Sequence, residues 1–203
     1  MIGSMVPNCV SLPTEYQLHS DDSISHQRRA WRPQYAVSGT LGLILLLVGN
    51  RIVPLSAWIS GNEKFAGLLR MMLLFAVWIA YEWLYQLLRM LLMRAYCGGA
   101  KRRFRFHLFY MEISSEACFN RRSCLLIDVF PTLFLATLTV VLLLLVPTFW
   151  FWPTYSILLL IEVQSFNSAF FAWRLFRLPS TLLVQADGDQ RRIFLPREEM
   201  NLF

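Results

Sequence analysis

The chain has 203 residues, of which 56% are hydrophobic and only 16% are charged. Soluble domains carry about 45–50% apolar and about 25% charged residues, so this composition excludes an ordinary soluble protein and indicates an integral membrane protein. The net charge of +6 does not indicate nucleic-acid binding, because the basic residues gather at the ends of apolar segments and no nucleic-acid-binding motif accompanies them.

The first 34 residues are polar and show no apolar period. They also lack the apolar stretch of a cleavable signal peptide, so we expect the first membrane span to direct insertion. We predict that residues 1–34 form a cytoplasmic N-terminal tail.

Four apolar segments follow, and basic or aromatic residues bound them. A helix needs about 20 residues to cross the hydrocarbon core of a bilayer. The first segment is shorter, and we expect Tyr35 and Arg51 to anchor its two ends. The sequence therefore predicts an all-α membrane protein with a four-helix membrane domain over residues 35–177, with transmembrane helices at about residues 35–50, 65–96, 125–146 and 154–176.

The second apolar segment carries a glutamate, Glu82, in the middle of its run LLRMMLLFAVWIAYEWLYQLLRMLLM. A charged residue at membrane depth costs about 2.5–3.5 kcal/mol on insertion scales, so an intramembrane acid indicates a functional site. Tyr81 and Tyr85 flank it at a spacing of four residues, which places both phenols on one face of a helix.

A polar, basic loop over residues 97–122 connects the second and third spans. Gly98 and Gly99 are expected to end the helix before it, and a weak alternation of Phe and Arg predicts a short extended segment. The four cysteines of the chain have no zinc-binding spacing, so we expect free thiols rather than a metal site.

Acidic and polar residues also fall within the third and fourth spans. Asp128 lies near the inner end of the third span, where we expect its carboxylate to be solvated. The fourth span holds a second intramembrane acid and several polar companions, which are not expected to face lipid. These residues are Glu162, Gln164, Ser165, Asn167 and Ser168.

The last segment, residues 178–203, is predicted to form a cytoplasmic C-terminal tail. Residues 182–184 and 193–195 are apolar, and an Asp187-Gly188 turn between them predicts a short β-like hairpin. Basic residues are abundant in the N-terminal flank, the 97–122 loop and this tail, whereas the two outer connections hold only Arg51 and Lys64. The positive-inside rule therefore predicts both termini in the cytoplasm.

The residues around Glu82 have the spacing of the HExxH zinc motif, with tyrosines at both histidine positions. In that motif two imidazoles hold zinc and the glutamate acts as general base on a metal-bound water. Tyrosine is a poor zinc ligand at neutral pH because its phenol titrates near 10. The replacement of both imidazoles by phenols therefore predicts that this helix does not form a competent metallopeptidase site.

The order of the segments nevertheless resembles a family of small bacterial zincin-type membrane metallopeptidases with a site-2-protease-like layout. The resemblance covers about residues 65–192 and includes the phrases FYMEISSEACFNRRSCLLIDVFPTLFLAT and NSAFFAWRLFRLPSTLLVQADGDQ. It implies that Tyr81 and Tyr85 stand where the family has histidine ligands, and that Glu82 matches the catalytic glutamate. Ser168, preceded by Asn167, stands where the family has an aspartate ligand. The resemblance thus implies the fold and a bacterial plasma membrane, but not proteolysis, because all three metal positions differ.

The sequence favours a non-catalytic membrane protein, a degenerate relative of that family, which contacts membrane lipid and binds or regulates another membrane protein or peptide without a cofactor. One alternative is a hydrogen-bonded polar core that only fixes helix packing. Another is an active intramembrane zinc metallopeptidase with Glu82 as its catalytic residue. A third is a small transporter or channel subunit that uses Glu82 and Glu162. The residues of the candidate binding or vestigial site are Tyr81, Tyr85, Glu162, Asn167 and Ser168, with no metal expected.

Overall fold

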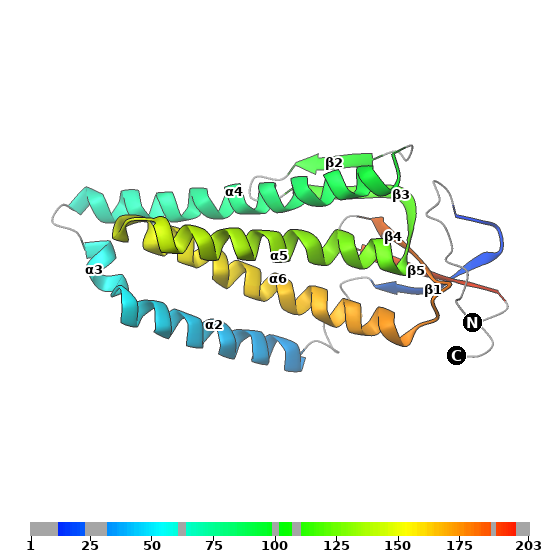
Figure 1. Cartoon of the computed structure of the whole chain (residues 1–203), viewed down its shortest axis with the longest axis horizontal. Helices are drawn as coiled ribbons and strands as arrows, with labels where there is room; N and C mark the ends of the chain where they lie inside the picture. Colours follow the sequence, from blue (N-terminus) through cyan, green and yellow to red (C-terminus); the bar gives the residue numbers. More distant parts are fainter. Residues whose placement is uncertain are drawn as a thin grey trace.

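The computed structural model of the chain describes residues 12–22, 32–60, 64–98, 102–106, 111–187 and 190–197. The protein is mostly helical, with a bundle of long helices and an antiparallel sheet at one end of it (Figure 1). The helices are α2 (Arg32–Ile52), α3 (Leu55–Ser60), α4 (Lys64–Tyr96), α5 (Arg121–Leu145) and α6 (Phe151–Arg177), and a short 3-10 turn, η1 (Thr148–Trp150), precedes α6.

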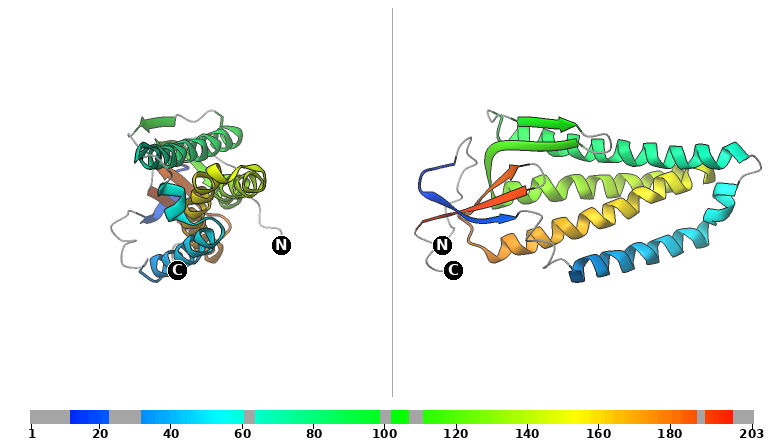
Figure 2. Two further views of the ribbon diagram at one scale, coloured as in Figure 1. Left: turned by 90° about the vertical axis from the view of Figure 1, so that its left-hand side faces the viewer. Right: turned by 180° about the vertical axis from the view of Figure 1, so that it is seen from behind.

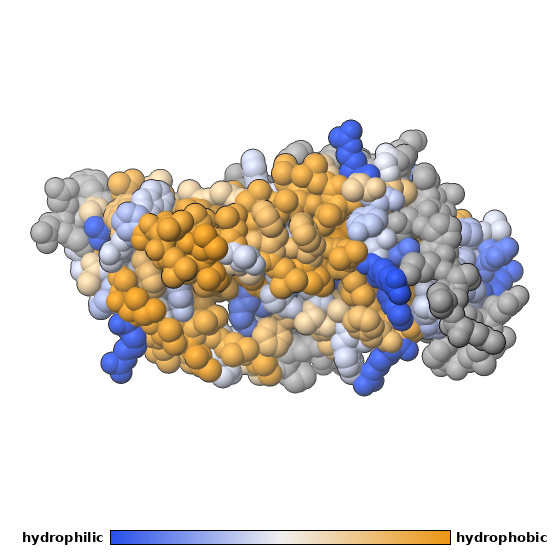
Figure 3. Space-filling model, in the orientation of Figure 1, coloured by the Kyte–Doolittle hydropathy of each residue, from blue (hydrophilic) through white to orange (hydrophobic). Residues whose placement is uncertain are grey.

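Three helical stretches are long and apolar enough to cross a membrane: Ala66–Tyr96, Arg121–Leu145 and Thr148–Arg177. They coincide with the three longer spans that the sequence predicts. The apolar part of α2, Ala36–Ile52, is shorter. Large apolar side chains cover the outside of the bundle, and hydrophilic residues gather toward its ends (Figure 3).

The helix α6 lies at the centre of the bundle, because it packs against α2 on one side and against α4 and α5 on the other (Figure 2). Tyr155 of α6 fixes the contact with α2 by donating a 2.7 Å hydrogen bond to the Leu45 carbonyl. Gly49 makes this close approach possible, since a Cβ at this position would lie 2.5 Å from the Tyr155 ring.

The sheet contains five described strands in the order β1-β5-β4-β3-β2, and every neighbouring pair is antiparallel. The strands are β1 (Tyr16–Asp22), β2 (Arg102–Phe106), β3 (Met111–Asn120), β4 (Leu183–Asp187) and β5 (Gln190–Pro196). Strand β3 contacts α4, so the sheet extends alongside the end of the bundle (Figure 2).

A shared hydrophobic core joins the sheet to the helices. Buried side chains of the strands, including Phe119, Val184 and Ile193, pack against Met93 of α4 and Leu175 of α6. Each of these five side chains is no more than 1% exposed. The sheet and the ends of the helices next to it therefore form one packed unit.

Two predicted tails differ from the structure. The predicted N-terminal tail contains a strand that its polar sequence does not indicate, because Tyr16–Asp22 forms β1 and pairs with β5. The C-terminal hairpin of β4 and β5 is present as the sequence predicts, but it lies in the middle of the sheet rather than forming a separate element. The all-α class therefore describes the bundle but not the whole chain.

The predicted connections also contain more structure than expected. The 97–122 loop supplies β2 and β3, and the outer connection after α2 contains α3. Asn120 caps α5 by accepting a 2.9 Å hydrogen bond from the Ser123 amide, so this helix begins four residues before the predicted span. The helix α2 begins at Arg32 rather than at residue 35.

Aromatic residues and one arginine close the end of the bundle opposite the sheet. Trp58 donates a 2.8 Å hydrogen bond to the Phe149 carbonyl, and Trp152 donates one of 3.0 Å to the Val53 carbonyl. Arg70 donates to the Trp58 carbonyl and lies over the rings of Trp58 and Phe149. These contacts hold α3 against the start of α6.

Candidate polar site in the helix bundle

A hydrogen-bonded bridge joins α4 to α6 at the acid that the sequence singles out. The Tyr81 hydroxyl donates a 2.6 Å hydrogen bond to Gln164 Oε1, and Gln164 Nε2 donates one of 2.8 Å to Glu82 Oε1. An amide has both a donor and an acceptor, so one glutamine side chain satisfies the phenol and the carboxylate together. The second and fourth predicted spans are therefore in contact at this bridge. The spacing of residues in the sequence does not by itself establish this contact.

The second tyrosine of the YExxY pattern lies beside the first. The two rings are 6.4 Å apart between centroids and inclined by 28°, as residues one helical turn apart require. Both are buried, and they pack with Leu135 of α5 and Ile161 of α6. The two tyrosines therefore face the interior of the bundle rather than its outer surface.

The helices α4 and α6 run in the same direction (Figure 1), so equal steps along both keep residues at the same level. Tyr81 contacts Gln164, and Tyr85 and Ser168 each lie four residues further along their helices. Ser168 is 6% exposed, which is consistent with a position inside the bundle one turn below Gln164. The side chain of Asn167 lies outside the described ones.

Glu162 is separated from this bridge, because it faces α2. Residues two apart on a helix point about 200° from each other, and Gln164 already faces α4. The Ser38 hydroxyl donates a 3.3 Å hydrogen bond to Glu162 Oε2, and a Cβ at Gly42 would lie 3.6 Å from the same oxygen. The other oxygen, Oε1, is buried and has no hydrogen-bond partner among the described residues. The five candidate site residues therefore do not form one cluster.

Gln164 is the site residue that the sequence reasoning missed. It is one of the polar residues of the fourth span, whereas the resemblance points to Ser168. The useful signal was its chemistry, since Gln can bond to an acid and a phenol at once.

A second charged cluster joins α4, α5 and the sheet. Arg89 lies 3.2 Å from one oxygen of Asp128, and Arg191 of β5 lies 2.9 Å from the other. Asp128 is 2% exposed, so the expectation of a solvated carboxylate is wrong: two guanidinium groups replace water around it. Arg191 also lies 3.9 Å over the Phe171 ring, which orients its side chain.

A small cavity adjoins this charged cluster. Arg89, Asp128 and Arg191 line it together with Cys124, and its size suits about one water molecule. Cys97, Cys118 and Cys124 are buried, and none of them forms a disulfide among the described residues. Within the described ranges, no three His, Cys, Asp or Glu side chains gather in a way that could hold a metal ion.

The arrangement around Glu82 is suited to holding helices together, because the acid and the first tyrosine are both engaged by Gln164. Comparison with models of protein families, with curated proteins and with solved structures finds no match for the chain. The resemblance to zincin-type membrane metallopeptidases therefore stays a prediction from the sequence.

Proposed function

We propose that this chain is a non-catalytic membrane protein that binds or regulates another membrane protein or peptide. The observation that carries the proposal is the bridge from Tyr81 through Gln164 to Glu82. A glutamate acting as general base must reach a water that it activates, whereas Gln164 donates to this carboxylate. In this bridge the Glu82 carboxylate serves to pack α4 against α6.

The ligand chemistry supports the same proposal. The two positions that would need imidazoles hold phenols, and the third position holds the Ser168 hydroxyl. None of these groups is a usual zinc ligand at neutral pH. The helix is then a degenerate version of a zinc-binding helix.

We further propose that four helices span the membrane, with both termini in the cytoplasm of a bacterial cell. Arg70 at the aromatic end of α4 and Arg89 near the sheet are nineteen residues apart, which corresponds to about 28 Å along a helix. The hydrocarbon core is about 30 Å thick, so the two arginines suit its two boundaries. Arg32 and Arg51 bound α2 at the same spacing.

The sheet supplies a surface for a partner. The Arg191–Asp128 ion pair fixes it to the bundle, and the strand order puts β1 and β2 at its edges. An edge strand offers backbone donors and acceptors to an extended segment of another protein. Arg103 and Arg105 on β2 are exposed, which favours an acidic segment.

Photo-crosslinking in cells tests the proposal against the metallopeptidase alternative. A photoreactive amino acid at Arg103 would be used in the wild-type protein and in Glu82→Gln, where the side chain keeps its volume. We expect the same partner, at its full length, from both proteins. Recovery of fragments from the wild type and of the uncleaved partner from Glu82→Gln would establish proteolysis and overturn the proposal.

One Glu162 oxygen has no partner in the described part of the chain, which favours a second candidate, a small transporter or channel subunit. A carboxylate between two membrane helices can carry a proton or bind a cation. Proton flux into vesicles that contain the purified protein tests this candidate. Flux that Glu162→Gln abolishes would support it, and identical background flux in both proteins would exclude it.

A further inference from the structure

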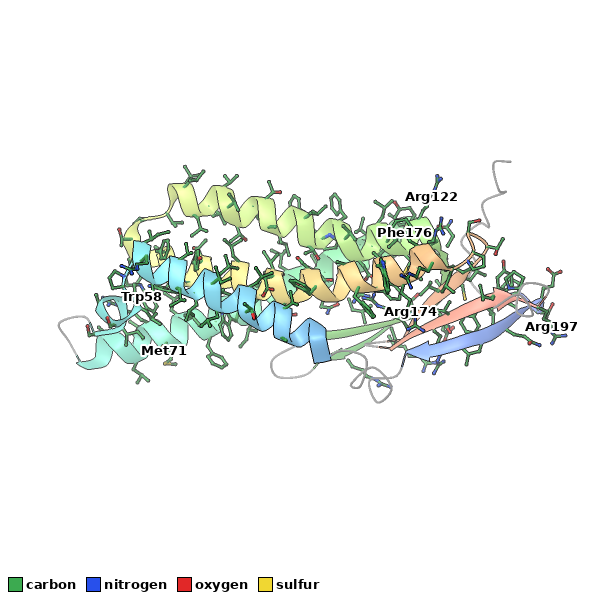
Figure 4. All side chains as sticks on the ribbon, turned by 90° about the horizontal axis from the view of Figure 1, so that it is seen from below. Trp58, Met71, Arg122, Arg174, Phe176 and Arg197 are labelled. Atoms are coloured by element: carbon green, nitrogen blue, oxygen red, sulfur yellow. The ribbon has the colours of Figure 1, made fainter. Side chains whose placement is uncertain are left out.

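An exposed patch of aromatic and basic residues lies at the sheet end of the bundle. Trp173, Phe176 and Arg177 belong to the last two turns of α6, and Arg121 begins α5 beside them. Trp173 is 50% exposed and Phe176 is 64% exposed. Phe176 of α6 and Arg122 of α5 both lie at the sheet end of the bundle (Figure 4).

Both guanidinium groups of the patch are held against its rings. The Arg177 guanidinium lies 3.8 Å from the centroid of the Trp173 ring, and that of Arg121 lies 5.6 Å from the Phe176 ring. Arg121 also donates a 3.2 Å hydrogen bond to the Leu178 carbonyl. A guanidinium has five N–H donors, so each group keeps several donors for a ligand while the rings fix its orientation.

No carboxylate among the described residues forms an ion pair with Arg121 or Arg177. Two acids near this end are engaged elsewhere: Asp128 is buried with Arg89 and Arg191, and Glu116 pairs with Arg103. The patch therefore carries two positive charges that an external anion can neutralise. Oriented guanidinium groups bind the oxygens of a phosphate in a bidentate manner.

The depth of the patch indicates where that phosphate comes from. By the register of Tyr81 with Gln164, Trp173 and Arg177 lie just beyond the level of Arg89, which the proposed membrane placement puts at the inner boundary. Exposed aromatic rings are typical of this depth, and the phosphates of the inner leaflet lie there.

We propose that Arg121 and Arg177 bind the phosphate of an anionic phospholipid, whose glycerol and upper acyl chain contact Trp173 and Phe176. This inference rests on the proposed membrane placement. The two unneutralised charges favour an anionic lipid over a zwitterionic one, because each arginine near an anionic surface adds to the attraction.

Nanodiscs that hold the full chain provide the test, with phosphatidylcholine alone or mixed with phosphatidylglycerol. We expect phosphatidylglycerol to raise the melting temperature of the wild type by about 4 °C, given two arginines at the surface. The variant Arg121→Gln/Arg177→Gln should lose most of this gain. The matched control, Arg103→Gln/Arg197→Gln, removes two exposed arginines at the sheet, outside the proposed membrane span, and should keep it.

Four further outcomes complete the test. Equal melting temperatures of the glutamine variant and the wild type in phosphatidylcholine alone show that both proteins fold. If these temperatures differ, Arg121→Lys/Arg177→Lys replaces the glutamine variant, and it should lose part of the gain from phosphatidylglycerol. An equal gain in the glutamine variant and the wild type overturns the lipid site. So does an equal gain from inorganic phosphate in phosphatidylcholine discs, because the site would then take a free anion. Failure of the wild type to remain in the discs would instead overturn the membrane placement.

Discussion

Arg191 in the sheet and Asp128 in the bundle form a 2.9 Å ion pair, although 63 residues separate them in the sequence. Arg89 contacts the second oxygen of the same carboxylate, so one buried acid connects two helices of the bundle to a strand. This ion-pair cluster adds to the hydrophobic core that joins the sheet to the bundle.

Replacement of Asp128 by Asn should therefore destabilise the protein strongly. The change leaves two guanidinium groups in a buried place without their carboxylate, which costs about 3 kcal/mol. Arg191→Met should cost less, because the pair of Asp128 with Arg89 remains. Thermal unfolding in detergent measures both losses, and faster proteolysis of the strands should accompany them.

Arg103→Gln is the control for this prediction. Its pair with Glu116 has a 3.3 Å separation, but the two side chains are 74% and 51% exposed. Exposed pairs contribute about 0–1 kcal/mol, so this variant should melt near the wild type. Equal effects of Arg103→Gln and Asp128→Asn would show that the buried cluster has no special role.

Glu162→Gln should raise the stability of the protein by about 1 kcal/mol. The amide keeps an oxygen for the Ser38 hydroxyl, and it costs less to bury than a carboxylate whose other oxygen lacks a partner among the described residues. Ser38→Ala should lower stability, because it removes the remaining bond. A loss of stability in Glu162→Gln, measured by unfolding in nanodiscs, would mean that the carboxylate itself is needed.

Labelling of single cysteines along α4 should locate the inner membrane boundary. Ala80 and Ala95 are both exposed on this helix, but the proposed placement puts Ala80 within the bilayer and Ala95 beyond Arg89. In a protein without its native cysteines, a water-soluble maleimide should label Ala95→Cys in open membranes and leave Ala80→Cys unlabelled. Equal labelling of the two positions would contradict the placement.

Restoring the metal ligands of the resembled family should create a zinc site. The triple variant Tyr81→His/Tyr85→His/Ser168→Asp places two imidazoles one turn apart on α4 and a carboxylate on α6 at the level of the second. Metal analysis of the purified proteins should find one zinc in the variant and none in the wild type. Stoichiometric zinc in the wild type would return catalysis as the leading hypothesis.

The long helices were predictable because their signal is local. Runs of apolar residues with basic ends predict α4, α5 and α6, and the Asp-Gly turn predicts the hairpin of β4 and β5. Strand β1 was missed because residues 16–22 are mostly polar and their partner, β5, lies more than 160 residues away. A strand of this kind is defined by its pairing rather than by its own composition.

The polar sites also divide into features with a local sequence signal, which were predictable, and contacts between distant segments, which were not. The helical period predicted that Tyr81 and Tyr85 share a face, but no local pattern identifies Gln164 as the residue opposite them. Asp128 was assigned to water because its position in the third span is near the boundary, and its partner Arg191 comes from the distant sheet. Contacts across helices and between the bundle and the sheet require the fold itself.

The most direct test of the account is a double-mutant cycle between Glu82 and Gln164, with each residue replaced by Met to retain its length. Unfolding of the wild type, both single variants and the double variant in nanodiscs gives their coupling energy. The account predicts a coupling energy of about 1 kcal/mol between Glu82 and Gln164, which is the usual size for a hydrogen bond between membrane helices. It predicts no coupling energy in a control cycle of Glu82→Met with Ser168→Ala. Additive losses in both cycles would contradict the claim that Gln164 engages Glu82 to hold α4 and α6 together.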